Sequence, residues 1–286
     1  MVDYIKIIFL AIFQGVSEFL PISSSGHLLI LKKIIAWNVS SAEFINILLH
    51  AGTLLSILIF YSKLLLDILK DFNTKLISQI IIGSIPIFVA GFIVKYSFLK
   101  NIISESSLIT GIGFIFSAII IYVSSKNYEK KLLENEHLND PKNHFSTLEN
   151  LTFSKVLVIG FMQAVAILPG VSRSGSTISM GLMLKLKKED CARFSFLLAI
   201  PAIAGAVGSK ILDIVGNSSE EWLLSFDIKH LALYAVGFVV SAVVGFFSLK
   251  FLLKVLQKGK LQYFSYYLLI IGAVTIVCSL IKLLNT

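Results

Sequence analysis

The stretch Gln163–Thr177, which reads QAVAILPGVSRSGST, decides the fold of this chain. It interrupts an apolar run at Pro169 and Gly170 and continues with serines, a threonine and an arginine. The apolar segments on either side, 153–168 and 178–186, are shorter than the about 20 residues that a helix needs to cross a bilayer. A polar break cannot face lipid, because its backbone groups would lack hydrogen-bond partners there. We therefore predict a helix–loop–helix that enters the membrane partway and turns back, with its loop buried in protein.

A second interrupted region lies near the start of the chain. Apolar residues 4–20 are followed by a proline and the polar run Ser23–Gly26, and apolar residues resume over 28–35. The sequence around Gln14 resembles the sequence around Gln163, which lies 149 positions later (163 − 14 = 149). The chain is therefore predicted to contain an internal repeat.

Composition places the rest of the chain in a membrane. Of the 286 residues, 56% are hydrophobic and 15% are charged, whereas a soluble domain has about 45–50% and about 25%. The net charge of +8 comes from short basic clusters between apolar segments, which orient helices, so no nucleic-acid partner is predicted. Six segments have about the length of a membrane span: 44–61, 76–94, 108–123, 194–212, 231–249 and 263–281.

These segments predict an all-α polytopic membrane protein with six transmembrane helices and two re-entrant helix–loop–helix segments. Each broken region precedes three spans. We predict a single integral membrane domain over 1–286, in which repeat halves at about 1–123 and 153–286 are joined by a cytoplasmic loop at about 124–152.

Charge predicts how the halves are oriented. Lys250, Lys254, Lys258 and Lys260 form the clearest basic loop, which the positive-inside rule places in the cytoplasm. Counting spans back from this loop puts the N-terminus outside, so the first half starts outside and the second half inside. This arrangement is an inverted-topology repeat, with two broken helices meeting near the middle of the membrane.

The two polar breaks predict an anion site. Helices that start at the breaks would aim free N–H groups at the same place, and helix N-termini bind phosphate or carboxylate. Arg173 adds a fixed positive charge with a geometry suited to phosphate. An arginine at this depth is costly and therefore functional by default. The alternative is that Arg173 pairs with Glu18 only to hold the fold.

Candidate reactive groups lie near the first break. Glu18, one helical turn after Gln14, could hold a divalent cation or act as a general acid or base. Ser24 and His27 share the first turn of a half-helix, as a nucleophile and its activating imidazole would. Their alternative roles are a helix-capping serine and a hydrogen-bonded core histidine. His50, inside a predicted span, either lines the same cavity or bonds a neighbouring carbonyl, and the second role is favoured.

At these residues the chain resembles the bacterial undecaprenyl-diphosphate phosphatase family, also known as the bacitracin-resistance proteins. The first family motif, Glu/Gln-x-x-x-Glu running into a proline and a serine-rich Gly-His, matches Gln14 through His27. The second, Pro-Gly-x-Ser-Arg-Ser-x-x-Thr, matches Pro169 through Thr177 without a gap. The resemblance covers nearly the whole chain. Some members have Glu where this chain has Gln14, which cannot be a charged ligand or a base.

The resemblance implies hydrolysis of undecaprenyl diphosphate to undecaprenyl phosphate and inorganic phosphate. This reaction recycles the lipid carrier of peptidoglycan synthesis at the outer face of the bacterial cytoplasmic membrane and confers resistance to bacitracin. The resemblance also implies a divalent cation, Mg²⁺ or Ca²⁺, and allows a homodimer.

A mechanism follows if the resemblance holds. Ser24 would attack the terminal phosphorus, with His27 as base or acid. Arg173 would neutralise the developing charge, and Glu18 would bind the cation or position a proton. The further candidate residues for binding the substrate phosphates are Gln14, Ser23, Ser25, Gly26, Gly170, Ser172, Ser174, Gly175 and Thr177.

The main alternative is a transporter or flippase for a lipid phosphate or another anion. Inverted repeats with broken helices at mid-membrane are a transporter architecture, and fold alone does not decide function. The cluster of Ser24, His27 and Glu18 favours the enzyme, because a carrier needs no nucleophile.

Overall fold

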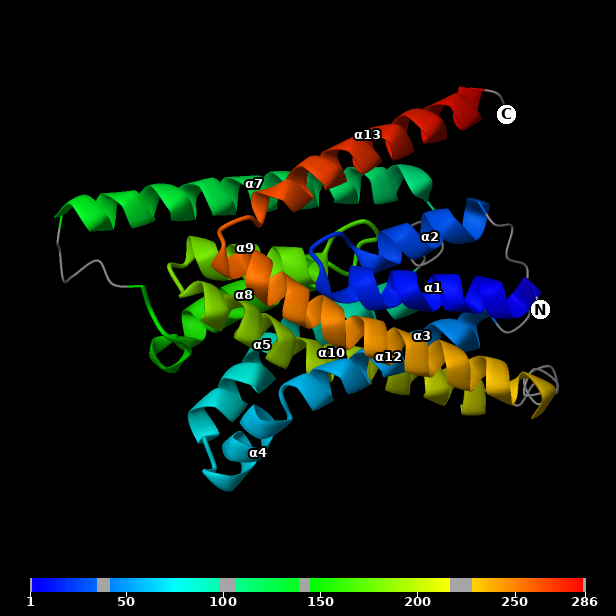
Figure 1. Ribbon diagram of the computed structural model, residues 1–286, viewed down its shortest axis with the longest axis horizontal. Coiled ribbons are helices and arrows are strands. Elements are labelled where there is room, and N and C mark those ends of the chain that lie inside the picture. Colours follow the sequence, from blue (N-terminus) through cyan, green and yellow to red (C-terminus); the bar gives the residue numbers. More distant parts are fainter. Residues whose placement is uncertain (1, 35–41, 98–105, 139–144, 217–227, 285–286) are drawn as a thin grey trace.

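The computed structural model describes residues 2–34, 42–97, 106–138, 145–216 and 228–284 (Figure 1). Within these ranges the regular elements are all helices, apart from one isolated bridge between Ser146 and Leu186. The α-helices are α1 (Val2–Phe19), α2 (Ser24–Ile34), α3 (Ala42–Phe60), α4 (Ser62–Lys70), α5 (Thr74–Tyr96), α7 (Ser107–Leu138), α8 (Phe153–Val165), α9 (Arg173–Met183), α10 (Lys188–Gly216), α12 (Ile228–Gln257) and α13 (Gln262–Leu284), and a short 3-10 helix spans Leu148–Asn150.

Each of the six predicted spans corresponds to a helix of the structure. Helices α5, α7, α10, α12 and α13 are long and apolar enough to cross a membrane. The sixth predicted span lies in α3, which together with α4 is apolar and long enough to cross, with a bend of 66° between the two helices. The chain is therefore a polytopic membrane protein. The predicted spans are shorter than the helices, since a helix continues past the end of its apolar segment wherever its backbone hydrogen bonds can.

Helix α7 differs most from its prediction. It runs to Leu138, so the first part of the stretch predicted as a cytoplasmic loop is helical. Good helix-forming residues fill this part, and pairs such as Lys126 with Glu129, at 3.4 Å, support the exposed turns. Residues 139–144 lie outside the described ranges.

Each of the two broken regions forms a helix–turn–helix segment, as predicted. Helices α2 and α9 each have 11 residues and are therefore about 16 Å long, about half of a hydrocarbon core of about 30 Å. Figure 1 shows α1 and α2 side by side, with their turn near the centre of the molecule, and α8 and α9 on the other side of that turn.

The two turns are in direct contact. The hydroxyl of Ser174 donates to the carbonyl of Leu20 at 3.3 Å. A β-carbon at Gly26 would lie only 2.9 Å from the Cα atom of Gly170, so the two backbones approach as closely as glycines allow. The two turns therefore pack directly against each other in the interior of the protein.

The two halves of the chain are intertwined. The first broken helix, α1, packs against α12 of the second half, and α8 of the second half packs against α5 of the first. The long helices α7 and α13 pack along one another (Figure 1). Phe19 and Phe196 meet edge to face in the shared core, with ring centres 5.8 Å apart. This exchange of partners is what an internal repeat would produce; the inverted repeat itself stays a prediction.

Candidate functional site

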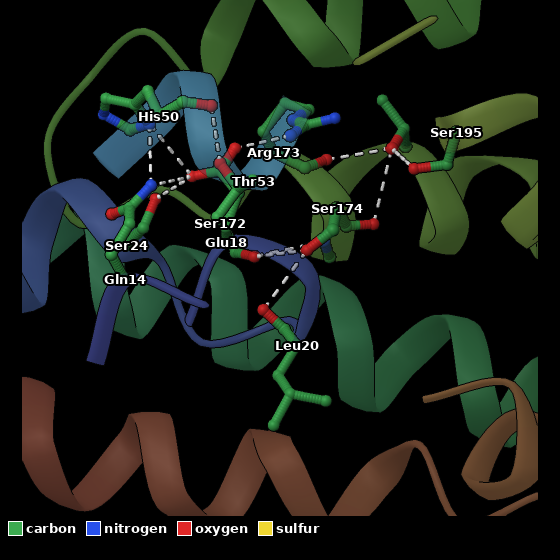
Figure 2. Close-up of polar contacts among 12 residues, drawn as sticks. Gln14, Glu18, Leu20, Ser24, His50, Thr53, Ser172, Arg173, Ser174 and Ser195 are labelled. Carbon is green, nitrogen blue, oxygen red and sulfur yellow. Dashed lines mark hydrogen bonds and ion pairs between the residues drawn. The ribbon is translucent and has the colours of Figure 1, made fainter. Parts of the chain in front are cut away.

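Glu18 is the centre of a polar cluster between the two turns (Figure 2). Its Oε1 forms an ion pair with Nη2 of Arg173 at 2.7 Å. Its Oε2 accepts a hydrogen bond from Oγ of Ser24 at 2.7 Å and another from Nε2 of Gln14 at 3.0 Å. Glu18 and Arg173 are both largely buried, with side chains 7% and 14% exposed. The cluster thus joins the last turn of α1 to the first residues of α2 and α9.

The first turn explains why Ser24 reaches Glu18. Pro21 follows the end of α1, and Ser23 has a positive φ of 69°, which reverses the chain so that α2 begins at Ser24. The carbonyl of Ser23 then accepts the backbone N–H of His27 at 3.3 Å. Ser24 occupies the first helical position, where its side chain points back to the end of α1.

The second turn presents Arg173 in the same way. Gly170 has φ of +87°, and Ser172 caps α9 by accepting the backbone N–H of Gly175 at 3.1 Å. The backbone N–H of Ser172 itself donates to the hydroxyl of Ser117 on α7 at 2.9 Å. Arg173 is thereby fixed as the first residue of α9.

A cavity of about 660 Å³ adjoins the cluster. Its polar end includes Glu18, Ser24 and Arg173, so the N-termini of α2 and α9 both meet it. Its walls run between α5 and α10. The apolar wall residues include Ile87, Phe88, Phe92, Ala202, Ile203, Gly205 and Ala206.

The far end of the cavity is polar again. There, at the ends of α5 and α10, Nζ of Lys95 donates to Oδ1 of Asp213 at 2.7 Å and to Oγ of Ser209 at 3.0 Å. The cavity therefore links a buried ionic cluster to a charged helix end through an apolar passage.

The predicted site residues divide into two groups. Those on the cavity wall are Glu18, Ser23, Ser24, Ser25, Ser172 and Arg173. Those that brace the turns from behind are Gln14, Gly26, His27, Gly170, Ser174, Gly175 and Thr177.

Thr177 illustrates the bracing role. Its hydroxyl donates to the carbonyl of Arg173 at 2.9 Å and lies 2.6 Å from the hydroxyl of Ser195 on α10. Its contacts hold the first turn of α9 in place.

The predicted pairing of Ser24 with His27 is not the one that forms. Nδ1 of His27 bonds the carbonyl of Ser23 at 2.9 Å, and Nε2 bonds the hydroxyl of Tyr267 on α13 at 2.7 Å. The imidazole stacks on the ring of Tyr267, with centres 5.6 Å apart and planes 7° apart, and it also packs against Phe114. Both ring nitrogens therefore have partners, and the group placed to accept the proton of Ser24 is Glu18.

His50 joins the cluster, although a bond to a neighbouring carbonyl was favoured for it. Its Nδ1 lies 2.7 Å from Nε2 of Gln14 and 3.5 Å from Oε2 of Glu18 (Figure 2). It lines the cavity wall from α3. A histidine inside an apolar span was the available signal, but nothing in the local sequence indicates which way it points.

The polar end of the cavity has unused capacity to bind an anion. Nη1 of Arg173 is buried and has no hydrogen-bond partner among the described residues. Buried donors are normally paired, so this unpaired nitrogen is an exception. Arg173 also lines the cavity, and its guanidinium can bind a phosphate oxygen there while keeping its ion pair with Glu18.

The same residues do not fit a divalent cation held by the protein alone. Both oxygens of Glu18 already have partners, and Arg173 places a positive charge beside one of them. Throughout the described part of the chain, no three His, Cys, Asp or Glu side chains are grouped as a metal site requires. Mg²⁺ and Ca²⁺ need several oxygen ligands, which this cluster does not supply.

Comparison with known proteins shows the family of this chain. The family model described as bacitracin resistance protein BacA matches residues 7–274. The chain belongs to this family. The match spans both turns, so every residue of the cluster lies within the BacA region.

Several curated relatives are similar over almost their full length. A protein of Pelagibacter ubique named undecaprenyl-diphosphatase is 36% identical over 95% of this chain and 96% of its own length. Proteins of the same name from Carboxydothermus hydrogenoformans and Methanosphaera stadtmanae are 37% and 33% identical, over 94% and 98% of this chain and 94% and 100% of their own lengths. The BacA family resemblance seen in the two motifs is therefore confirmed over nearly the whole chain.

Proposed function

We propose that this chain hydrolyses undecaprenyl diphosphate to undecaprenyl phosphate and inorganic phosphate, recycles the lipid carrier for peptidoglycan synthesis and so confers resistance to bacitracin. The names of its BacA relatives support this activity. The single observation that carries it is the hydroxyl of Ser24 held 2.7 Å from a carboxylate that is itself paired with Arg173. A membrane cavity with a serine, a carboxylate and an arginine at one end is suited to phosphoryl transfer.

The geometry supports a two-step reaction. In the first step Oγ of Ser24 forms a bond to the terminal phosphorus while the bond from that phosphorus to the bridging oxygen breaks. The proton of Ser24 passes to Glu18, and undecaprenyl phosphate leaves with the bonding electrons on its oxygen. Glu18 then releases this proton to solvent. In the second step water attacks the phosphoserine and gives a proton to Glu18, the bond from phosphorus to Oγ of Ser24 breaks, and Oγ takes that proton from Glu18 as inorganic phosphate leaves.

The surrounding residues stabilise charge during both steps. Arg173 and the free N–H groups at the starts of α2 and α9 would bind the phosphate oxygens, where negative charge develops. His27 and Tyr267 would position the turn that carries Ser24. The apolar walls between α5 and α10 would hold the first isoprenyl units, with the rest of the tail in the surrounding lipid.

A divalent cation enters this proposal as part of the substrate complex. The diphosphate offers the oxygen ligands that Mg²⁺ or Ca²⁺ prefers and that the protein cluster lacks. We propose that the cation arrives bound to the diphosphate.

Orientation follows from the charge argument. The positive-inside rule places the basic loop with Lys258 and Lys260 in the cytoplasm. Counting spans back from that loop puts the ends of α5 and α10 that carry Lys95 and Asp213 on the outer side. We propose that the cavity opens to the outer face of the bacterial cytoplasmic membrane, where the diphosphate is produced. A homodimer also stays a prediction.

The test is phosphate release from undecaprenyl diphosphate by the purified protein in lipid nanodiscs, with Mg²⁺ or Ca²⁺ present. We expect steady turnover that falls at least about 10³-fold in Ser24→Ala. Ser25→Ala is the matched variant, because Ser25 lines the same cavity and does not bond Glu18. Its rate of phosphate release should stay within about tenfold of the wild-type rate.

The same purified protein, reconstituted in sealed vesicles, separates hydrolysis from transport. If the folded wild type releases no phosphate but moves labelled lipid across vesicles, the enzymatic proposal is wrong and the flippase alternative stands. Full activity in Ser24→Ala would instead leave hydrolysis in place and remove the serine nucleophile in favour of direct attack by water.

A further inference from the structure

His50 differs from the rest of the cluster in how it meets the cavity. Its side chain is 34% exposed, whereas Glu18 is 7% exposed and is occupied on both oxygens. Among the described residues, Gln14 and Glu18 contact its Nδ1, and none bonds its Nε2. The ring thus contacts the cluster with one nitrogen and has the other available to a ligand in the cavity.

Gln14 determines which nitrogen of His50 carries the proton. An amide nitrogen has two hydrogens to donate, and Nε2 of Gln14 lies 3.0 Å from Oε2 of Glu18 and 2.7 Å from Nδ1 of His50. Turning the amide over would put its oxygen against the carboxylate, two acceptors 3.0 Å apart. The network therefore fixes the amide, makes Nδ1 of His50 an acceptor and leaves the imidazole proton on Nε2.

We propose that His50 is a second phosphate-binding residue, which donates an Nε2–H hydrogen bond to a non-bridging oxygen of the diphosphate. Gln14 is then a positioning residue that sets the tautomer of His50. This inference rests on the proposed function and adds to it. Gln14 and His50 take no part in the proposed hydrolytic steps. The inference gives both residues a role in recognising the substrate.

Three roles for His50 predict different kinetics. As a donor in both the ground state and the transition state, it contributes mainly to substrate binding, so its loss raises KM more than it lowers kcat. As an acid or base it would transfer a proton, so its loss would lower kcat. An amide side chain such as glutamine, which does not transfer protons, would then not restore kcat. As a packing residue it would affect stability without a selective effect on KM.

The kinetic test compares His50→Gln with His50→Ala. A glutamine amide can donate where Nε2–H did, so we expect KM for undecaprenyl diphosphate within about fivefold of wild type in His50→Gln. We expect a rise of about 10- to 100-fold in His50→Ala, the size of a hydrogen bond to a charged group. Equal KM values in wild type and His50→Ala, or a collapse of kcat in His50→Gln, would overturn the proposal.

The tautomer is tested without turnover. Spectra of protein labelled with ¹⁵N-histidine should contain one resonance pair that disappears in His50→Gln, with a protonated Nε2 and an unprotonated Nδ1. Gln14→Met, which removes the donor, should weaken this preference. A proton on Nδ1 in the wild type would contradict the role assigned to Gln14.

These readouts separate two failures. A folded wild type that releases no phosphate would remove the proposed function, whatever the spectra show. A wild type that turns over normally, with His50→Ala unchanged in KM, would remove only the role of His50.

Discussion

Glu18 and Arg173 lie 155 positions apart in the chain and form an ion pair of 2.7 Å where the two broken helices meet. A carboxylate and a guanidinium buried together attract strongly, but removing them from water costs nearly as much. Their pairing alone therefore does not explain why both are present. Ser24 donates to the second oxygen of Glu18, and Nη1 of Arg173 has no partner among the described residues. Both observations point to a role of the pair in the reaction.

Neutralising the carboxylate should stop turnover. Glu18→Gln keeps the shape of the side chain but cannot take the proton of Ser24, so we expect phosphate release to fall about 10²- to 10⁴-fold. Asp67→Asn, an exposed carboxylate on α4, is the control and should be unaffected. Release above a tenth of the wild-type rate in Glu18→Gln would rule out Glu18 as the base.

Gly170→Ala should destabilise the folded protein. The positive φ of Gly170 costs about 1–2 kcal/mol for any other residue, and an added β-carbon would also collide with the carbonyl of Thr110. Thermal unfolding in detergent should show a lower Tm.

Gly208→Ala is the opposite control, because nothing lies within 4 Å of a β-carbon there and alanine favours a helix. Its Tm should stay or rise. Equal Tm values for the two variants would show that the turn at Gly170 is not as tight as described.

Filling the apolar passage should weaken binding of long substrates. Ala202→Phe places a ring in the cavity between α5 and α10, at a steric cost of about 1–3 kcal/mol. We expect KM for undecaprenyl diphosphate to rise at least about tenfold. Ala204→Phe, on the same helix but exposed and away from the cavity, is the matched variant. Equal KM values for the two variants would show that the prenyl tail of the substrate does not lie in this cavity.

Much of this structure could be predicted from the sequence, for physical reasons. A span is identified by its length of apolar residues, and a break in a span by proline, glycine and serine, so α5, α10 and the two turns were all expected. Pairing of Glu18 with Arg173 was also considered, since a buried charge needs a partner.

Other features depend on contacts that sequence spacing does not reveal. The extension of α7 to Leu138 reflects helix formation beyond the apolar segment. The partner of His27 is Tyr267, 240 positions away, which draws the imidazole away from Ser24. His50 reaches Gln14 only because α3 packs beside α1.

Cation binding should depend on the diphosphate. Calorimetric titration of Mg²⁺ or Ca²⁺ into the protein without lipid should give no saturable heat, since both oxygens of Glu18 already have partners and Arg173 places a positive charge beside one of them. Adding a non-hydrolysable polyprenyl diphosphate analogue should create binding with one cation per protein. Tight binding to the protein alone, lost in Glu18→Gln, would show that Glu18 is a metal ligand after all.

If Glu18 and Arg173 serve hydrolysis rather than the fold, removing both charges should abolish turnover and leave the protein folded. Phosphate release from undecaprenyl diphosphate is compared between wild type and the double variant Glu18→Gln with Arg173→Gln. The double variant leaves no unpaired charge, so its Tm should stay close to that of the wild type. We predict steady release by the wild type and background release by the folded double variant. Near-normal release by the double variant would show that the pair is not needed for hydrolysis, and no release by the folded wild type would show that the protein is not this phosphatase.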